Sequence, residues 1–375
     1  MLTTESRERD FPSLCGRVYL NSAAEGIPPL SVSAALQQYF MDKQEGMDGR
    51  PAHFAQLDRV KELTAEFYGL NDAEIGICSC SSEAYNLVSM ALALSTGDEV
   101  VINDLDFPAG VTPWLQSACP ATVRVWRSVN GALRTKDLIP LLSLKTRFVT
   151  TSLVSFFNGF VVPLNEVCEV VRRRSSALLG VDITQALGRI PLDLHDVDLI
   201  VSSTHKWILS SHGGGLVGVP SARAAELTVP AGGWLHLQDA FGAQRFESAV
   251  SRPGAASYAV GMPNFPAIYA IRAGLEYIQK TGVAAIHAAA GPLTEQCIDG
   301  LAGMPVELLT PRNEPLAGIV AFRHPRADEI HQKLRERNIH IMGNAGRLRV
   351  AVHGYNTSQD IETLLSTLSE ILKST

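Results

Sequence analysis

Residues 203–218, STHKWILSSHGGGLVG, decide which fold and which chemistry we expect. This stretch combines one lysine, two histidines and four glycines. Three interpretations compete: a dinucleotide-binding loop, the oxyanion loop of a hydrolase, and a lysine that anchors an aldehyde cofactor. The residues around the stretch decide among them.

The glycines do not complete either of the first two motifs. Gly213, Gly215 and Gly218 fit the spacing G-x-G-x-x-G, but they lead into the β-rich run 215–219 instead of opening a helix after a strand. The run 212–215 has the H-G-G-G form of an oxyanion loop, yet no G-x-S-x-G elbow occurs to supply a nucleophile. A dinucleotide site and a serine hydrolase are therefore not expected.

The lysine has a possible partner at the end of another predicted strand. Lys206 follows the predicted strand 199–202, and Asp182 follows the predicted strand 177–181. Open α/β sheets bind ligands at the carboxyl ends of their strands. An amine that holds an aldehyde as a Schiff base, and a carboxylate that keeps a pyridine nitrogen protonated, are what a pyridoxal phosphate (PLP) enzyme requires. Taken alone, the two residues are better explained as a surface ion pair, and only the surrounding residues favour the cofactor site.

The wider sequence predicts an α/β fold with two domains. Between residues 54 and 219, β-rich runs alternate with helical patterns, which is typical of a mainly parallel sheet sandwiched by helices. Segment 230–263 is irregular, and such segments usually carry function or contact a partner. Helical patterns resume at 265, and later β-runs predict a smaller α+β domain. We therefore expect an N-terminal segment (1–20) that packs on the small domain, a cofactor-binding major domain (21–264) and a small domain (265–375). The predicted strands of the major domain are 74–78, 99–103, 122–126, 146–152, 177–181, 199–202 and 215–219.

Composition argues against several classes of partner. The chain has 375 residues, of which 46% are hydrophobic and 19% charged, and its net charge is −6, so we expect neither nucleic-acid nor membrane binding. Six cysteines without a C-x-x-C pair indicate reduced thiols and no metal centre. The charged N-terminus and the absence of a run of ~18 apolar residues predict a cytoplasmic protein.

The motif around the two strand ends resembles that of a known family. Asp182, Gln185, Ser203, His205 and Lys206 are spaced as in the class V aminotransferase and cysteine desulfurase family of fold type I PLP-dependent enzymes. The resemblance implies a PLP cofactor and a homodimer. It implies that Lys206 forms the Schiff base and then acts as general base, and that Asp182 stabilises the cationic ring. His205 would stack near the phosphate or tune Lys206, Ser203 would lie in the cofactor site, and Gln185 would bond the phenolic oxygen.

Other segments of the chain resemble this family as well. Hydroxyls and backbone N–H groups at a helix start bind anions, which suits the expected phosphate site. An arginine grips a carboxylate with two parallel hydrogen bonds, which suits substrate binding. Met262 stands where the family commonly has a threonine that reaches the partner's phosphate. The positions implied by the resemblance are Ser81 and Ser82 for the phosphate, Phe107 for stacking on the ring, Asn158 for the phenolic oxygen, Arg349 for the substrate carboxylate with Arg347 as the second choice, and Asn21 in the entrance segment 21–29.

The sequence specifies the cofactor more closely than the reaction. Transamination, racemisation and β-elimination share their first steps, and desulfurases of this family add a cysteine persulfide carrier on a mobile loop of the C-terminal lobe. Cys297 is the candidate for that carrier, but its neighbours predict an apolar helix position. We therefore rank an aminotransferase first and keep a carbon–sulfur lyase or an epimerase as alternatives. A non-catalytic small-molecule-binding module is the alternative from another class.

Overall fold

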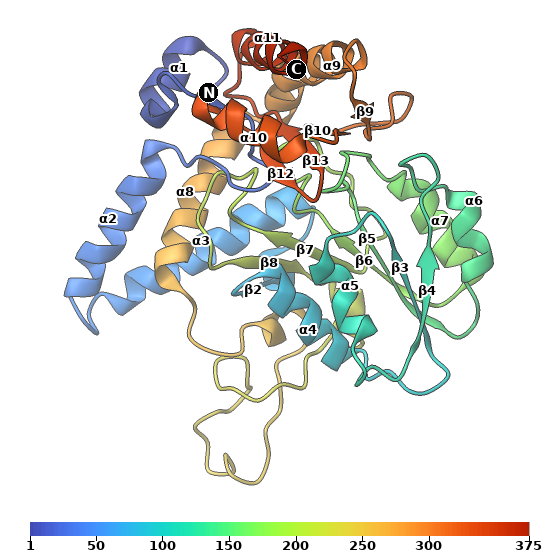
Figure 1. Ribbon diagram of the computed structural model, residues 1–375. Coiled ribbons are helices and arrows are strands. Elements are labelled where there is room, and N and C mark those ends of the chain that lie inside the picture. Colours follow the sequence, from blue (N-terminus) through green and yellow to red (C-terminus); the bar gives the residue numbers. More distant parts are fainter. Residues whose placement is uncertain (375) are drawn as a thin grey trace.

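A seven-stranded sheet forms the centre of the large domain in the computed structural model, which describes residues 1–374 (Figure 1). All strands run parallel except β8, which is antiparallel to both of its neighbours. The predicted mainly parallel sheet is thus confirmed. In spatial order the strands are β2 (Ile75–Cys78), β8 (Gly215–Gly218), β7 (Leu199–Ser203), β6 (Leu178–Asp182), β5 (Thr146–Ser152), β3 (Glu99–Asn103) and β4 (Thr122–Trp126).

Helices cover both faces of this sheet because the strand side chains alternate between two apolar cores. Val101, Val149 and Leu179 point into one core, and Val100, Phe148 and Leu178 point into the other. The first core is closed by α3 (Arg50–Tyr68), α7 (Leu164–Arg174) and α8 (Phe265–Thr281), and the second by α4 (Ser81–Ala91) and α5 (Pro108–Leu115). Helix α2 (Leu30–Gln44) packs on α8 outside the first core.

The C-terminal part of the chain builds a second, antiparallel sheet, as the α+β prediction requires. Its strands are, in spatial order, β12 (Met342–Asn344), β13 (Arg347–Ala351), β10 (Ile319–Arg323) and β9 (Glu307–Leu308). Its core includes residues of α9 (Val283–Ala302), α10 (Ala327–Glu336) and α11 (Ser358–Lys373).

The N-terminal segment lies beside these C-terminal elements (Figure 1). Helix α1 (Thr4–Asp10) contacts α11 through an ion pair between Arg7 and Asp360 at 3.3 Å. Strand β1 (Val18–Tyr19) pairs in parallel with β11 (Ile339–His340). The boundaries of the three expected segments remain a prediction.

Residues 230–263 form a long irregular excursion that projects from the large domain away from the small domain (Figure 1). Its regular structure is one 3-10 helix, Gly254–Tyr258, and one isolated bridge between Leu237 and Ser251. Two of its aromatic side chains, Phe241 and Phe246, are 77% and 85% exposed. No helix within residues 1–374 has the length and apolar character needed to cross a bilayer.

Candidate active site

Lys206 and Asp182 lie at the carboxyl ends of two neighbouring strands. Asp182 is the last residue of β6 and pairs with Val201 of β7, two residues before Ser203 closes that strand. Burial lowers the pKa of Lys206 to about 8, and the nearby Asp182 carboxylate only partly opposes this shift. Burial likewise raises the pKa of Asp182. The Thr184 N–H, which donates to the Asp182 carboxylate at 2.8 Å, and the positive charge of Lys206 both lower this pKa and offset only part of the effect of burial. The expected pair is therefore close enough to interact electrostatically.

A second acid, the half-buried Asp106, lies near this pair and was missed by the sequence analysis. Asp106 accepts the backbone N–H of Ser152 at 2.7 Å, just beyond the end of β3. Burial, together with the charge of the Asp182 carboxylate, raises its pKa to about 7. A buried and a half-buried carboxyl group favour a positively charged ligand group beside them, because opposite charge offsets their desolvation.

The start of α4 faces the end of β7. The Ser203 hydroxyl donates to the Ser81 hydroxyl at 2.9 Å, while Ser82, one residue further, is exposed. The first N–H groups of a helix have no intrahelical acceptor and attract anions. Gly215 of β8 passes so close that a Cβ there would lie 2.6 Å from the carbonyl carbon of Cys80. The two predicted serines thus lie at a helix start next to the lysine strand, and Ser81 is the one bonded to it.

Phenylalanine rings form a wall beside the lysine. The Lys206 Nζ lies 5.3 Å from the centroid of the Phe107 ring, which is 46% exposed. The Phe156 ring meets Phe107 edge-on, with centroids 5.1 Å apart. Phe107 is therefore next to the lysine, as expected, and Phe156 is a neighbour that the sequence analysis did not identify.

The structure does not bring the side chain of Asn158 to this wall. Its amide donates to the carbonyls of Gly131 at 2.8 Å and Leu309 at 3.4 Å, and its Oδ1 accepts the Phe160 N–H at 3.2 Å. Both amide hydrogens thus bind backbone oxygens, one of them next to β9 of the small domain. These contacts correct the expectation for Asn158: its side chain joins three loops, and Phe156 is the member of this loop that faces Phe107.

Gln185 is also engaged by other protein groups. Its Nε2 donates to the Ala23 carbonyl at 3.1 Å, and its Oε1 accepts the indole N–H of Trp207 at 2.6 Å. These bonds tie the segment after β6 to the entrance segment and to the residue after Lys206. One amide hydrogen of Gln185 is left for a ligand oxygen.

Two arginines of β13 reach the Phe156 loop from the small domain. Arg349 is 4% exposed and donates its Nη1 to the Phe156 carbonyl at 2.8 Å, whereas its Nε is buried without a hydrogen-bond partner. Burial, followed by the charge of Arg347, lowers the pKa of Arg349 to about 10. Arg347 donates to the Phe157 carbonyl at 2.5 Å and lies over the Phe157 ring. A buried guanidinium with an unused donor fits a ligand carboxylate, which favours Arg349 over Arg347.

The entrance segment packs directly on the lysine backbone. Gly26 donates its N–H to the His205 carbonyl at 2.8 Å, and a Cβ at Gly26 would overlap the Lys206 carbonyl. The Oδ1 atom of Asn21 is buried without a hydrogen-bond partner, so it offers an acceptor to a ligand. His205 stacks on His212 with centroids 4.2 Å apart. Burial, together with the charge of Lys206, lowers the pKa of His205 to about 4, so His205 is neutral near pH 7.

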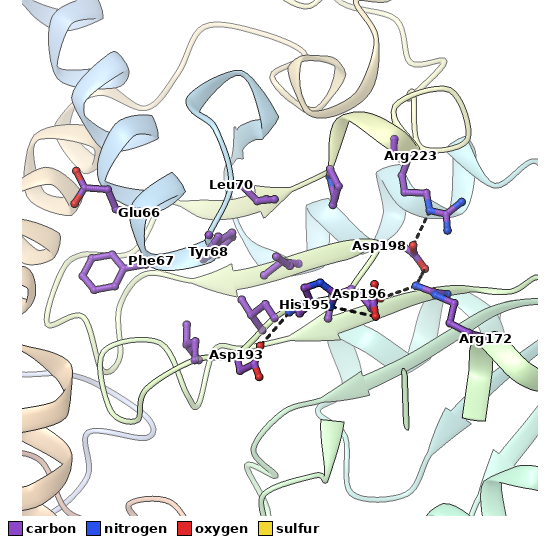
Figure 2. A pocket seen from close by; sticks show the side chains of 17 residues that line it. Glu66, Phe67, Tyr68, Leu70, Arg172, Asp193, His195, Asp196, Asp198 and Arg223 are labelled. Atoms are coloured by element: carbon purple, nitrogen blue, oxygen red, sulfur yellow. Dashed lines mark hydrogen bonds and ion pairs between the residues drawn. The ribbon is translucent and has the colours of Figure 1, made fainter. Parts of the chain in front are cut away.

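A pocket of about 730 Å³ lies at the other end of β7 and is not part of this site. Figure 2 shows Arg172 and Arg223 on either side of Asp198, the residue before β7. Each guanidinium binds the Asp198 carboxylate at 2.7 Å, and the Leu179 N–H does so at the same distance. The carboxylate is saturated by these bonds, which tie α7, β6 and the start of β7 together.

The residues around Lys206 suit an aromatic aldehyde that carries a phosphate. A cationic ring nitrogen would offset the buried Asp182 charge, the Lys206 amine can react with an aldehyde, and the start of α4 suits a phosphate. A carboxylate for the ring nitrogen, an amine for the aldehyde and a helix start for the phosphate together define a fold type I PLP-dependent enzyme. The chain belongs to the family described as Aminotransferase class-V, whose model matches residues 18–364. PLP is the cofactor of this enzyme.

Among the relatives of the chain, one is named an aminotransferase and others are named cysteine desulfurases. The uncharacterized aminotransferase YcbU of Bacillus subtilis is 26% identical over 354 residues, covering 94% of this chain and 93% of the relative. A probable cysteine desulfurase of Methanothermobacter thermautotrophicus is 26% identical over 412 residues, covering 99% and 98%. The cystine C-S lyase C-DES, in a mutant with glycine covalently linked to its PLP cofactor, has a similar fold, with a TM-score of 0.89 at 24% identity over 97% of this chain and 99% of the other.

Proposed function

We propose that this protein is an aminotransferase that acts on the amino group of an amino acid. The observation that carries the proposal is that burial lowers the pKa of the Lys206 amine, on which the charges of both Asp182 and Arg349 act. A lysine with a pKa near the working pH can both give and accept protons. The arginine adds a site for the carboxylate of the substrate.

Each residue of the site has a separate task in this proposal. PLP supplies an aldehyde that condenses with amines and a ring that accepts electrons. Asp182 holds a proton on the ring nitrogen, Arg349 orients the substrate carboxylate, and Phe107 with Phe156 limits the access of water. Lys206 would remove the proton from the substrate α-carbon and would deliver it to the former aldehyde carbon on the other side of the amino nitrogen, which is the proton movement that transamination needs.

The product formed by the PLP-loaded protein tests this proposal. We would incubate it with single amino acids in the absence of a keto acid and follow pyridoxamine phosphate and keto acid. An aminotransferase forms both in a single stoichiometric turnover, which an added keto acid then makes catalytic. Release of sulfide or persulfide from cysteine or cystine, with the cofactor unchanged, would contradict it in favour of a lyase. A protein that forms no product and whose spectrum is insensitive to every amine would favour a binding module.

Cys297 discriminates between a desulfurase with a cysteine carrier and the other reactions. Its thiol is fully buried within the small-domain core, and burial raises its pKa to about 12. A thiolate is the nucleophile in persulfide chemistry, so this cysteine is held in the unreactive form. We expect Cys297→Ala to change turnover on any substrate by less than about twofold while costing about 1 kcal/mol of stability. A turnover that falls with this substitution while the melting temperature is kept would contradict the assignment.

The pH dependence of cofactor uptake should report the titration of Lys206. Only the neutral amine attacks an aldehyde, so the uptake rate of cofactor-free protein should rise with pH through about 8. The positive charge of Arg349 lowers the pKa of Lys206. Removing that charge in Arg349→Met should therefore move the midpoint to higher pH. Glu25 raises the pKa of Lys206, so Glu25→Gln should move the midpoint the other way. Absorbance in stopped flow measures both, and shifts of the same sign would contradict this account.

We further propose a homodimer in which residues 230–263 contact the partner subunit. Phe241 and Phe246 are exposed aromatic side chains, and residues of this kind are enriched in interfaces. Met262 is 46% exposed and shares a small pocket with Ser79 and Glu83 at the start of α4. We expect the double variant Phe241→Ser and Phe246→Ser to sediment as a monomer. Leu144→Ser, which changes a 90% exposed residue elsewhere, is the matched control and should stay dimeric.

A further inference from the structure

Arg189 is a buried guanidinium without a carboxylate partner. It follows β6 in the large domain and is 1% exposed. Its Nε donates to the Val352 carbonyl at 2.9 Å. Its two terminal nitrogens make only long contacts, with His287 Nδ1 at 3.4 Å and with Thr294 Oγ1 at 3.3 Å. No ion pair to Arg189 occurs among residues 1–374, and burial accordingly lowers the pKa of this arginine to about 10.

The terminal nitrogens face a pocket of about 510 Å³ between the two domains. Its walls are α9 and the segment before β10. The backbone leaves room for the arginine, because a Cβ at Gly318 would lie 2.3 Å from the Arg189 Nε. The other polar residues that line the pocket are His287, Thr294, Glu295, Asp299, Arg312 and Glu314.

The acidic residues of the pocket do not neutralise Arg189. Asp299 pairs with Arg312 at 3.0 Å, and Glu314 pairs with Arg134 at 2.6 Å. Glu295 is exposed at the rim. A buried charge that lacks a counter-charge is costly, and a guanidinium with free N–H donors matches the oxygens of phosphate and carboxylate groups.

We propose that this pocket binds a small oxyanion, through a phosphate or carboxylate group held by Arg189. The site is separate from Arg349 and from the start of α4. It is nevertheless linked to the lysine, because the Arg189 guanidinium lies 6.0 Å from the ring centroid of Trp207, the residue after Lys206. An anion that fixes Arg189 would also fix the residue to which Gln185 is bonded.

The test introduces a carboxylate side chain on α9 that can occupy the pocket in place of a bound anion. A Cβ at Gly291, which lines the pocket, meets no atom within 4 Å, so a longer side chain fits there. Gly291→Glu places a carboxylate in the pocket, and Gly291→Gln is its neutral match with a similar helix propensity. Both are compared with the wild type, loaded with PLP so that the cofactor phosphate site is filled.

Melting temperatures are measured against inorganic phosphate, acetate and chloride at equal ionic strength. We expect phosphate to raise the melting temperature of the wild type and of Gly291→Gln saturably, by more than chloride does. Gly291→Glu should melt higher without added anion and should lose the phosphate response. A comparable response to acetate would identify the ligand group as a carboxylate, and a response to phosphate alone would identify a phosphate. Equal responses of the Glu and Gln variants, or a wild-type response no larger than with chloride, would overturn the proposal.

Discussion

Lys206→Ala should lose activity by at least about 10³-fold, because it removes the general base of the proposed reaction. It should also lose the visible absorbance change that borohydride produces in PLP-loaded protein, since no lysine amine at this position remains to be trapped. The substitution should not unfold the protein. The Lys206 amine is protonated below its lowered pKa of about 8, and its buried charge opposes folding at pH 7.

Two controls separate the role of Lys206 as a base from its role as a cation. Lys206→Arg keeps a positive charge but cannot release a proton, so it should be as inactive as the alanine variant. A small primary amine added to the solution should restore part of the turnover of Lys206→Ala, because the truncated side chain leaves space for it. The same amine should not rescue Lys206→Arg. An arginine variant with more than about a tenth of wild-type turnover would contradict the assignment of the base.

Strand ends were the most predictable part of this protein. The β-rich runs that end near Asp182 and Ser203 appear in β6 and β7, and parallel strands necessarily deliver their following residues to one edge of the sheet. The position of Lys206 beside Asp182 therefore needed only strand order and direction. The antiparallel direction of β8 was harder to predict, because its short glycine-containing sequence shows the same pattern in a parallel and in an antiparallel strand.

Loop side chains were the least predictable part. Between residues 154 and 161 the chain has neither helical nor strand periodicity, so spacing could not decide whether Phe156 or Asn158 faces Phe107. The turn at Gly159, with a φ of +83°, directs Asn158 toward backbone carbonyls that belong to distant segments. The Leu309 carbonyl is brought there by the packing of the small domain. For the same reason, no motif marks Asp106 in the sequence, and it becomes a neighbour of Asp182 only in the fold.

Asp182→Asn should lower turnover by about 10²–10³-fold, because an amide has the shape of the carboxylate but cannot hold a proton on the cofactor ring. The fold around position 182 should be kept, since the asparagine oxygen can still accept the Thr184 N–H that Asp182 accepts at 2.8 Å. Burial raises the pKa of the Asp182 carboxyl group, which means that its charged form is disfavoured in the folded protein. The substitution removes this unfavourable charge. Steady-state turnover and the melting temperature are the two measurements.

Cofactor uptake distinguishes this electronic role from a general disturbance of the site. The Asp182 charge raises the pKa of Lys206, so its removal should lower that pKa further and leave more neutral amine near pH 7. The asparagine variant should therefore take up PLP at pH 7 at least as fast as the wild type while turning over far more slowly. Asp182→Glu, which keeps the charge on a longer side chain, should recover part of the turnover. An asparagine variant that keeps turnover within about threefold of the wild type would show that the ring nitrogen needs no buried acid in this enzyme.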